Sequence, residues 1–205
     1  MRLFVIGATG HIGAQAIDIA LSRSHQVTAF VRSPQKIVRR DPRLTVVQGD
    51  PHSIEQLSQA LPGHDAVLSA LGVRPPQAFR PHTLVEECAA STVAAMANTG
   101  VNRLVLVSAA VLFPQTGLVF AFFRRFLKHI GRDLKAAEEI VRRTSLDWTI
   151  ARPPRLTNGS DSAYRAVRDA LPDKGSAMSF RGVAAFMVDA VEHRSFVREL
   201  VGIAR

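Results

Sequence analysis

The stretch RLFVIGATGHIG, residues 2–13, decides the fold of this chain. Its first five residues form an apolar run of strand length, and a glycine-rich loop with the spacing GxxGxxG follows at once, from Gly7 to Gly13. A helical pattern begins inside the loop. Glycines in this context allow a tight turn and the close approach of a pyrophosphate to the unpaired N–H groups of the helix start. The stretch predicts a dinucleotide-binding loop; the alternative is that the glycines only pack the helix against the strand.

The residues of this loop that we expect to bind the cofactor are Gly7, Thr9, Gly10, His11, Ile12 and Gly13. His11 has a second interpretation, because a histidine at the start of a surface helix can simply be exposed to solvent.

Apolar runs rich in Val, Ile and Leu recur along the chain and alternate with helical patterns. Strands are predicted at 2–6, 26–31, 44–48, 65–70, 103–108, 147–151 and 199–203. Helices are predicted at 11–22, 33–40, 53–60, 83–98, 133–144 and 182–192. Such alternation is typical of a parallel sheet covered on both faces. The predicted fold class is therefore α/β, a Rossmann-like doubly wound parallel sheet flanked by helices.

The chain length predicts a single domain, residues 1–205, since domains commonly contain roughly 100–200 residues. With 47% hydrophobic residues, the chain can bury a substantial core. The alternation breaks at Arg152-Pro153-Pro154, because a proline cannot donate a backbone hydrogen bond, and a polar loop follows. Residues 152–180 are predicted to form a small C-terminal cap on the substrate side.

The charge and the cysteine content limit the classes of partner. The net charge of +9 favours anionic partners, which include a phosphorylated cofactor, nucleic acid and an acidic membrane surface. No nucleic-acid-binding motif occurs, so no nucleic acid is expected as a partner. The single cysteine, Cys88, falls on an apolar helical stripe and is predicted to be a core residue rather than a nucleophile. The dispersed histidines predict no metal site.

The same features bear on location. The apolar run at the start of the chain is too short for a signal peptide, so a cytoplasmic monomer or homodimer without a transmembrane segment is expected. The segment LVFAFFRRFLKHI, residues 118–130, is either an interfacial helix or a set of aromatic residues packed beneath the cap. At this length it cannot span a bilayer.

The end of the second strand indicates which dinucleotide is bound. An acidic residue is expected there when the ribose hydroxyls of NAD are bound, but this strand ends in Val31-Arg32-Ser33. The guanidinium of Arg32 suits the additional phosphate of NADP, with Ser33 supplying a hydroxyl and Lys36 a further charge. The pattern favours NADP(H); the alternative is a solvated arginine.

Further candidate residues follow the next strands. Asp50 is expected beside the adenine pocket, unless it only stabilises the turn in which it lies. The small residues Ala70, Leu71 and Gly72 are expected to place backbone beneath the cofactor, and Arg74 follows them as a candidate substrate contact. Ser108 ends the fifth strand, where open parallel sheets bind ligands, and its hydroxyl could hold the nicotinamide amide or a substrate oxygen, or only satisfy a turn.

Several segments together carry a family resemblance. They are GATGHIG (7–13), VRSP (31–34), QGDP (48–51), SALG (69–72), LVLVSAA (104–110) and LDWTIARPP (146–154). In this order they resemble the atypical short-chain dehydrogenase/reductase superfamily, in particular the NAD(P)H-binding group around flavin reductase and biliverdin-IXβ reductase. LDWTIARP is shared with the NmrA-like branch. The resemblance covers nearly the whole chain, and it implies NADP(H) binding, Arg32 at the adenosine phosphate, Ser108 as the active-site serine, and a flavin, quinone or tetrapyrrole as hydride acceptor.

Two departures from the family pattern limit the chemistry. Arg155 stands where the biliverdin-type enzyme has a histidine after its paired prolines, so Arg155 replaces that histidine as a candidate substrate residue. Where short-chain dehydrogenases have YxxxK, this chain has Gly131 and Lys135, and its one tyrosine, Tyr164, lies elsewhere. Without that tyrosine, a proton transfer to an alcohol oxygen lacks its acid/base. The sequence thus predicts an NADPH-dependent reductase of a planar acceptor; the alternative is an NmrA-like NADP(H) sensor without catalysis.

Overall fold

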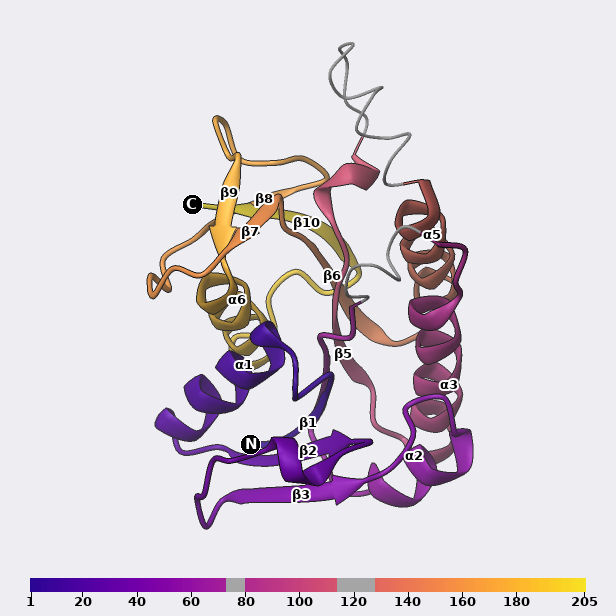
Figure 1. The fold of residues 1–205 in the computed structure, drawn as a ribbon. Helices are drawn as coiled ribbons and strands as arrows, with labels where there is room; N and C mark the ends of the chain where they lie inside the picture. The colour runs from indigo at the N-terminus through magenta and orange to yellow at the C-terminus, as the bar shows by residue number, and fades with distance from the viewer. Residues whose placement is uncertain (73–79, 114–127) are drawn as a thin grey trace.

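A computed structural model describes residues 1–72, 80–113 and 128–205, and its central feature is an 8-stranded sheet with the strand order β3-β2-β1-β4-β5-β6-β10-β8 (Figure 1). The strands are β1 (Arg2–Ile6), β2 (Gln26–Val31), β3 (Leu44–Gln48), β4 (Ala66–Ser69), β5 (Arg103–Val107), β6 (Asp147–Arg152), β8 (Arg165–Arg168) and β10 (Glu199–Ala204). All neighbouring pairs are parallel except β10 with β8. The order reverses between β1 and β4, which is the switch point at which doubly wound sheets bind ligands. The predicted fold class is confirmed.

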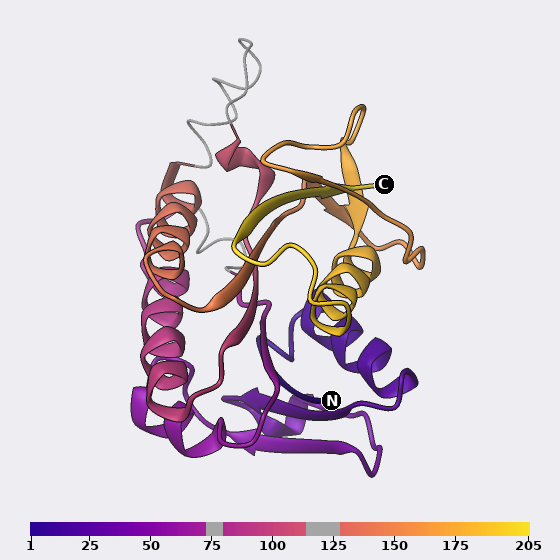
Figure 2. The ribbon, with the colours of Figure 1, turned by 180° about the vertical axis from the view of Figure 1, so that it is seen from behind.

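Helices cover both faces of the sheet, as Figures 1 and 2 show from opposite sides. One face carries α1 (His11–Ser22) and α6 (Phe180–Glu192), and the other carries α2 (Ile54–Ala60), α3 (Leu84–Thr99) and α5 (Lys128–Arg142). Consecutive strand residues alternate between the two cores: Val105 belongs to the first and Leu104 to the second. Because both faces are covered, the strands are continuously apolar, and this is why they could be recognised in the sequence.

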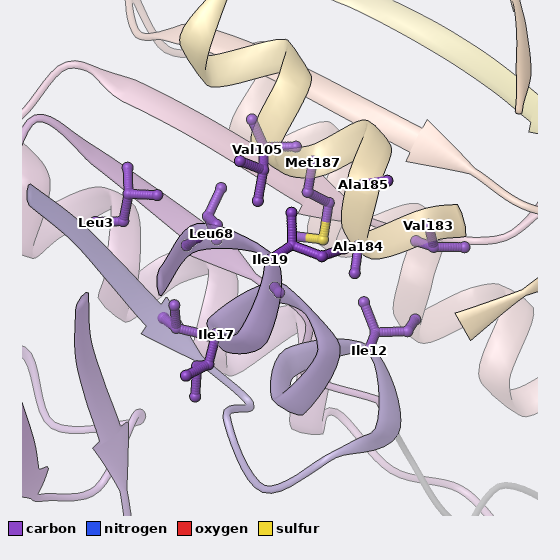
Figure 3. Close-up of a cluster of buried hydrophobic side chains, with 14 of the residues drawn as sticks. Leu3, Ile12, Ile17, Ile19, Leu68, Val105, Val183, Ala184, Ala185 and Met187 are labelled. Atoms are coloured by element: carbon purple, nitrogen blue, oxygen red, sulfur yellow. The ribbon is translucent and has the colours of Figure 1, made fainter. Parts of the chain in front are cut away.

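The first core shows how the fold positions the glycine loop. In Figure 3, isoleucines of α1 and small apolar residues of α6 gather against strand residues of the sheet; the labelled members include Ile12, Ile17, Ile19, Val183, Ala184, Met187, Leu3, Leu68 and Val105. The side chain of Ile12 is 9% exposed and that of Ile17 3%. Burial of such side chains contributes about 1.5–3 kcal/mol each. This packing holds the start of α1 directly above the end of β1.

Two segments differ from the sequence-based expectation. The predicted helix 33–40 is only a short 3-10 helix, Pro34–Lys36, because the residues after it offer no apolar face: Ile37 is buried but Val38 is 86% exposed. The region 152–180 contains β7 (Arg155–Thr157) and β9 (Ala177–Ser179), which pair with each other, but its remaining strand, β8, extends the main sheet antiparallel to β10. Within the three described stretches, no helix is long and apolar enough to cross a membrane.

Candidate cofactor-binding cleft and active site

A cleft of about 210 Å³ opens at the carboxyl ends of β1 and β4, at the switch point of the sheet. Most residues that line it were predicted from the sequence: Gly7, Thr9, Gly10, Arg32, Lys36, Ala70, Leu71 and Gly72. Pro51, His52 and Leu84 also line the cleft and were not predicted. Segments from four consecutive strand ends and from the start of α3 therefore meet at one place, as the Rossmann arrangement requires.

The glycine loop leaves no room for side chains. Gly7 has φ +80°, and a Cβ atom there would lie 2.6 Å from the carbonyl carbon and oxygen of Ala70. A Cβ atom at Gly13 would lie 2.3 Å from the backbone oxygen of Gly7. Gly10 is the N-cap of α1 and has no side chain to cap the helix start. The loop thus combines close backbone packing with a helix N-terminus whose N-cap residue offers no side chain, and this arrangement fits a pyrophosphate.

Five of the predicted cofactor residues do not line the cleft: His11, Ile12, Gly13, Ser33 and Asp50. The ring of His11 stacks on Phe180 with centroids 4.7 Å apart, and Ile12 is buried in the core beneath α1. Asp50 accepts a hydrogen bond from the backbone N–H of His52 at 3.1 Å, and the same Oδ1 lies 3.2 Å from Nδ1 of the His52 ring, an arrangement typical of a turn. These contacts favour the interpretation of His11 as an exposed surface residue and of Asp50 as a residue that stabilises its turn.

The outer end of the cleft is basic. Arg32 and Lys36 are both exposed, and neither forms an ion pair with an acidic residue of the described chain. Ser33 precedes the 3-10 helix as its N-cap, and its side chain makes no capping hydrogen bond. By contrast, Arg39 pairs with Asp18 at 2.9 Å and Arg43 with Asp41 at 3.1 Å. The two lining cations are therefore available for an anionic ligand.

Ser108 lies at the end of β5, on the face covered by α3 and α5. Its side chain is 8% exposed, its N–H donates to the Ala151 oxygen at 2.8 Å, and its Oγ has no hydrogen-bond partner among the described residues. A buried hydroxyl without a partner costs about 1–3 kcal/mol, so such a group marks a place where a ligand can bind. Only the backbone N–H of Ser108 therefore makes a hydrogen bond of the kind that satisfies a turn, and its hydroxyl makes none with the described residues.

A buried ion pair lies beside Ser108. Arg152 ends β6, and its Nε and one terminal nitrogen donate to the two carboxylate oxygens of Glu138 on α5, at 2.9 and 2.5 Å. The guanidinium also lies 4.7 Å from the centroid of the Phe113 ring. Because β5 and β6 are in parallel register, Ser108 and Arg152 follow the last pair, Val107 with Ala151, and project to the same face. Ser108 and the ion pair therefore lie on the same face of the sheet, although the lining of the cleft at β1 and β4 includes none of them.

The YxxxK frame is incomplete in space as well as in sequence. A Cβ atom at Gly131 would meet no described residue within 4 Å, and the Lys135 side chain is 71% exposed and lies 3.8 Å from Glu139. Tyr164 lies on the opposite face, where its hydroxyl donates to Asp189 at 2.7 Å. Burial, and then the hydrogen bond to Asp189, raise the pKa of Tyr164 far above its usual range. The one tyrosine of the chain therefore lies away from Lys135, on the other face of the sheet.

The remaining candidates are placed as follows. Arg74 lies outside the described residues, as does most of the segment 118–130. Arg155 is exposed at the start of β7, and the cleft lining does not include it. Cys88 is 2% exposed, and burial raises the pKa of its thiol to about 11, which agrees with the predicted core position.

Comparison with known proteins identifies the family. A family model described as NAD(P)H-binding matches residues 7–194, and the chain belongs to this family. An uncharacterized chloroplastic protein of Arabidopsis thaliana is 32% identical over 168 residues, 77% of this chain and 60% of that protein. Photosystem II assembly factor Ycf39 of Synechocystis is 28% identical over 216 residues, 97% of this chain and 61% of that protein. The chain thus spans about 60% of the length of these two relatives.

Solved structures share the fold. The oxidoreductase ylbE of Lactococcus lactis superposes with a TM-score of 0.84 at 21% identity, covering 100% of this chain and 91% of that one. A short-chain dehydrogenase/reductase of Veillonella parvula in complex with NADP has a TM-score of 0.80 at 20% identity, covering 100% and 94%. The predicted Rossmann fold and NAD(P)H-binding family are confirmed.

Proposed function

We propose that this member of the NAD(P)H-binding family is an NADPH-dependent oxidoreductase that transfers hydride to a flavin, quinone or tetrapyrrole. One observation carries the proposal: Ser108 follows β5, the strand next to β4, and its buried hydroxyl has no hydrogen-bond partner among the described residues, while the position of the acid/base tyrosine is glycine. A planar, electron-poor acceptor needs orientation more than it needs a phenol.

The preference for NADPH rests on the cations of the cleft. Arg32 and Lys36 line it and have no acidic partner among the described residues, and Arg32 follows the second strand, where a ribose-binding acid would stand in an NAD enzyme. A guanidinium can donate two parallel hydrogen bonds to a phosphate, which is why arginine suits the additional phosphate of NADP. The neighbouring hydroxyl of Ser33 is a further donor.

The chain's own residues bind and orient the reactants. When bound, the reduced nicotinamide supplies the hydride, and a proton from water completes the reduction of the acceptor. The glycine loop holds the pyrophosphate through backbone N–H groups, and Ser108 orients the nicotinamide amide or an acceptor oxygen by one hydrogen bond. The chain forms a single domain, and in it residues 152–180 shape the side of the site at which the acceptor binds. Arg155, at the rim of this region, is proposed to contact an anionic acceptor.

Turnover tests this proposal. Oxidation of NADPH would be followed by its absorbance with FMN, riboflavin, a soluble quinone or a linear tetrapyrrole, for the wild-type protein, Ser108→Ala and the control Ser58→Ala on α2. We expect turnover in the wild type and the control, and a roughly tenfold or greater loss of kcat in Ser108→Ala without a comparable loss of NADPH affinity. Tight NADPH binding with none of these acceptors reduced would refute the proposed reaction.

A second candidate function is an NADP(H) sensor without catalysis. The observation that favours it is the similarity to a relative named as an assembly factor, together with the missing tyrosine. A sensor must distinguish the two redox states, because a ligand shifts an equilibrium only by its differential affinity. Calorimetric titrations with NADP⁺ and NADPH would then give clearly different Kd values, in the absence of turnover. Equal Kd values would exclude this role.

A further inference from the structure

The frame GRDLK contains a buried carboxylate that is separate from the lysine. Asp133, on α5, is 1% exposed. Its Oδ1 accepts from the N–H of Glu86 at 2.8 Å, and its Oδ2 accepts from the N–H of Val85 at 3.1 Å. His82 approaches the same Oδ2 to 2.8 Å through Nδ1, at an ion-pair distance without hydrogen-bond alignment. Asp133 therefore contacts the chain immediately before and within the first turn of α3.

This contact replaces an ordinary helix cap. The first N–H groups of a helix have no partner within the helix, and the N-cap side chain normally accepts from one of them. Thr83 is the N-cap of α3, but its side chain makes no capping hydrogen bond and donates to Glu87 at 2.6 Å instead. The cap of α3 is thus supplied by a different helix, and the position of the α3 start depends on α5.

The start of α3 forms part of the cofactor cleft. Leu84, the first residue of the helix, lines the cleft, and its carbonyl oxygen lies 3.1 Å from Nε2 of His52, which also lines it. A continuous set of contacts therefore joins Asp133, through the first turn of α3, to two lining residues that come from different segments of the chain.

We propose that Asp133 is a positioning residue for the cofactor cleft, and that the function of the GRDLK frame in this chain resides in Asp133 rather than in Lys135. Asp133 fixes the first turn of α3, which in turn holds Leu84 and His52 against the bound dinucleotide. Without the carboxylate the uncapped turn frays, and the wall of the cleft loses its shape. The inference rests on the proposed binding of NADPH in this cleft.

The test measures NADPH affinity by titration of its fluorescence, with the thermal midpoint recorded on the same samples. We expect Asp133→Ala to raise Kd about tenfold and Asp133→Asn, which keeps one acceptor oxygen, to raise it less. The control Glu139→Gln removes a carboxylate from the same helix that is 48% exposed, and should change Kd less than about twofold.

A double-mutant cycle separates positioning from mere loss of stability. If Asp133 acts through the α3 start and His52, then Asp133→Asn and His52→Ala combined should weaken binding less than the product of their separate effects. A fall in thermal midpoint with Kd unchanged, or two fully independent effects on Kd, would overturn the inference.

A measurement on the wild-type protein does not depend on the folding of any variant. NADPH should slow hydrogen exchange at the amides of Val85 and Glu86 at least about threefold, because the bound dinucleotide holds the first turn of α3. If NADPH binds and these amides exchange as before, the inference fails although the proposed function stands. If NADPH does not bind at all, both fail.

Discussion

Replacing Arg152 with methionine should destabilise the protein by about 3–5 kcal/mol, which is the usual cost of leaving one partner of a buried ion pair unpaired. Arg152 is 8% exposed and Glu138 2%, so neither charge is screened by water, and methionine would leave the carboxylate of Glu138 buried without its two donors. For a domain of this size, 1 kcal/mol corresponds to about 2–4 °C, so the thermal midpoint should fall by roughly 6–20 °C.

The chain offers a matched control in Arg168. Like Arg152, it pairs with a glutamate, Glu199, at 2.6 Å, and its guanidinium lies 5.6 Å from a phenylalanine ring. The difference is exposure, since the side chains of Arg168 and Glu199 are 68% and 29% exposed. Exposed pairs contribute only about 0–1 kcal/mol, so Arg168→Met should be nearly neutral. Urea and thermal unfolding of both variants would be compared.

The double variant Arg152→Met/Glu138→Leu provides the decisive comparison. Removing both charges leaves no unpaired carboxylate, so this variant should recover at least about 2 kcal/mol relative to Arg152→Met alone. The reasoning is wrong if Arg152→Met costs no more than Arg168→Met, or if the double variant is no more stable than the single one. Either result would show that Glu138 is solvated or already paired elsewhere.

Three further predictions concern single residues. Gly13→Ala should abolish NADPH binding in a fluorescence titration, since its Cβ would lie 2.3 Å from a backbone oxygen. Gly131→Ala, with no described residue within 4 Å of the added Cβ, should instead add about 0.5–1 kcal/mol to the free energy of unfolding. Arg32→Gln should reduce the preference for NADPH over NADH about tenfold or more, as judged from Kd values, because a hydrogen bond to a charged group contributes roughly 1.5–3 kcal/mol; Arg39→Gln should leave the preference unchanged. The pKa of Cys88 is raised from 9.0 to about 11 by burial, so its contribution to stability is present below pH 9 and is lost as the pH rises towards 11. The stability difference between the wild type and Cys88→Ala should therefore shrink between about pH 8 and about pH 10 in urea unfolding, and a constant difference would contradict the assignment.

Secondary structure was predictable wherever a local pattern was strong. The strand 2–6 and the helix 11–22 have the predicted bounds, because a fully buried strand is continuously apolar and a helix on a sheet carries an apolar stripe. The predicted helix 33–40 was wrong, because Pro34 starts only one short turn and the residues after it offer no apolar face, with Val38 86% exposed. The described part of α5, Lys128–Arg142, already includes the residues just before the predicted 133, where the sequence gives little apolar signal.

The sequence by itself determined the order of the strands along the chain, the glycine loop and the cations that follow the second strand, because these depend on neighbouring residues and on the known geometry of parallel sheets. Only the tertiary structure decided that β8 joins the sheet, that His52 and Leu84 line the cleft, and that Asp133 caps a helix to which it does not belong. The two hydrogen bonds that Asp133 accepts from Glu86 and Val85 join residues 47 and 48 positions apart. A local pattern reports the face that a helix buries, but the partner of each buried polar group is set by the packing of distant helices on the sheet.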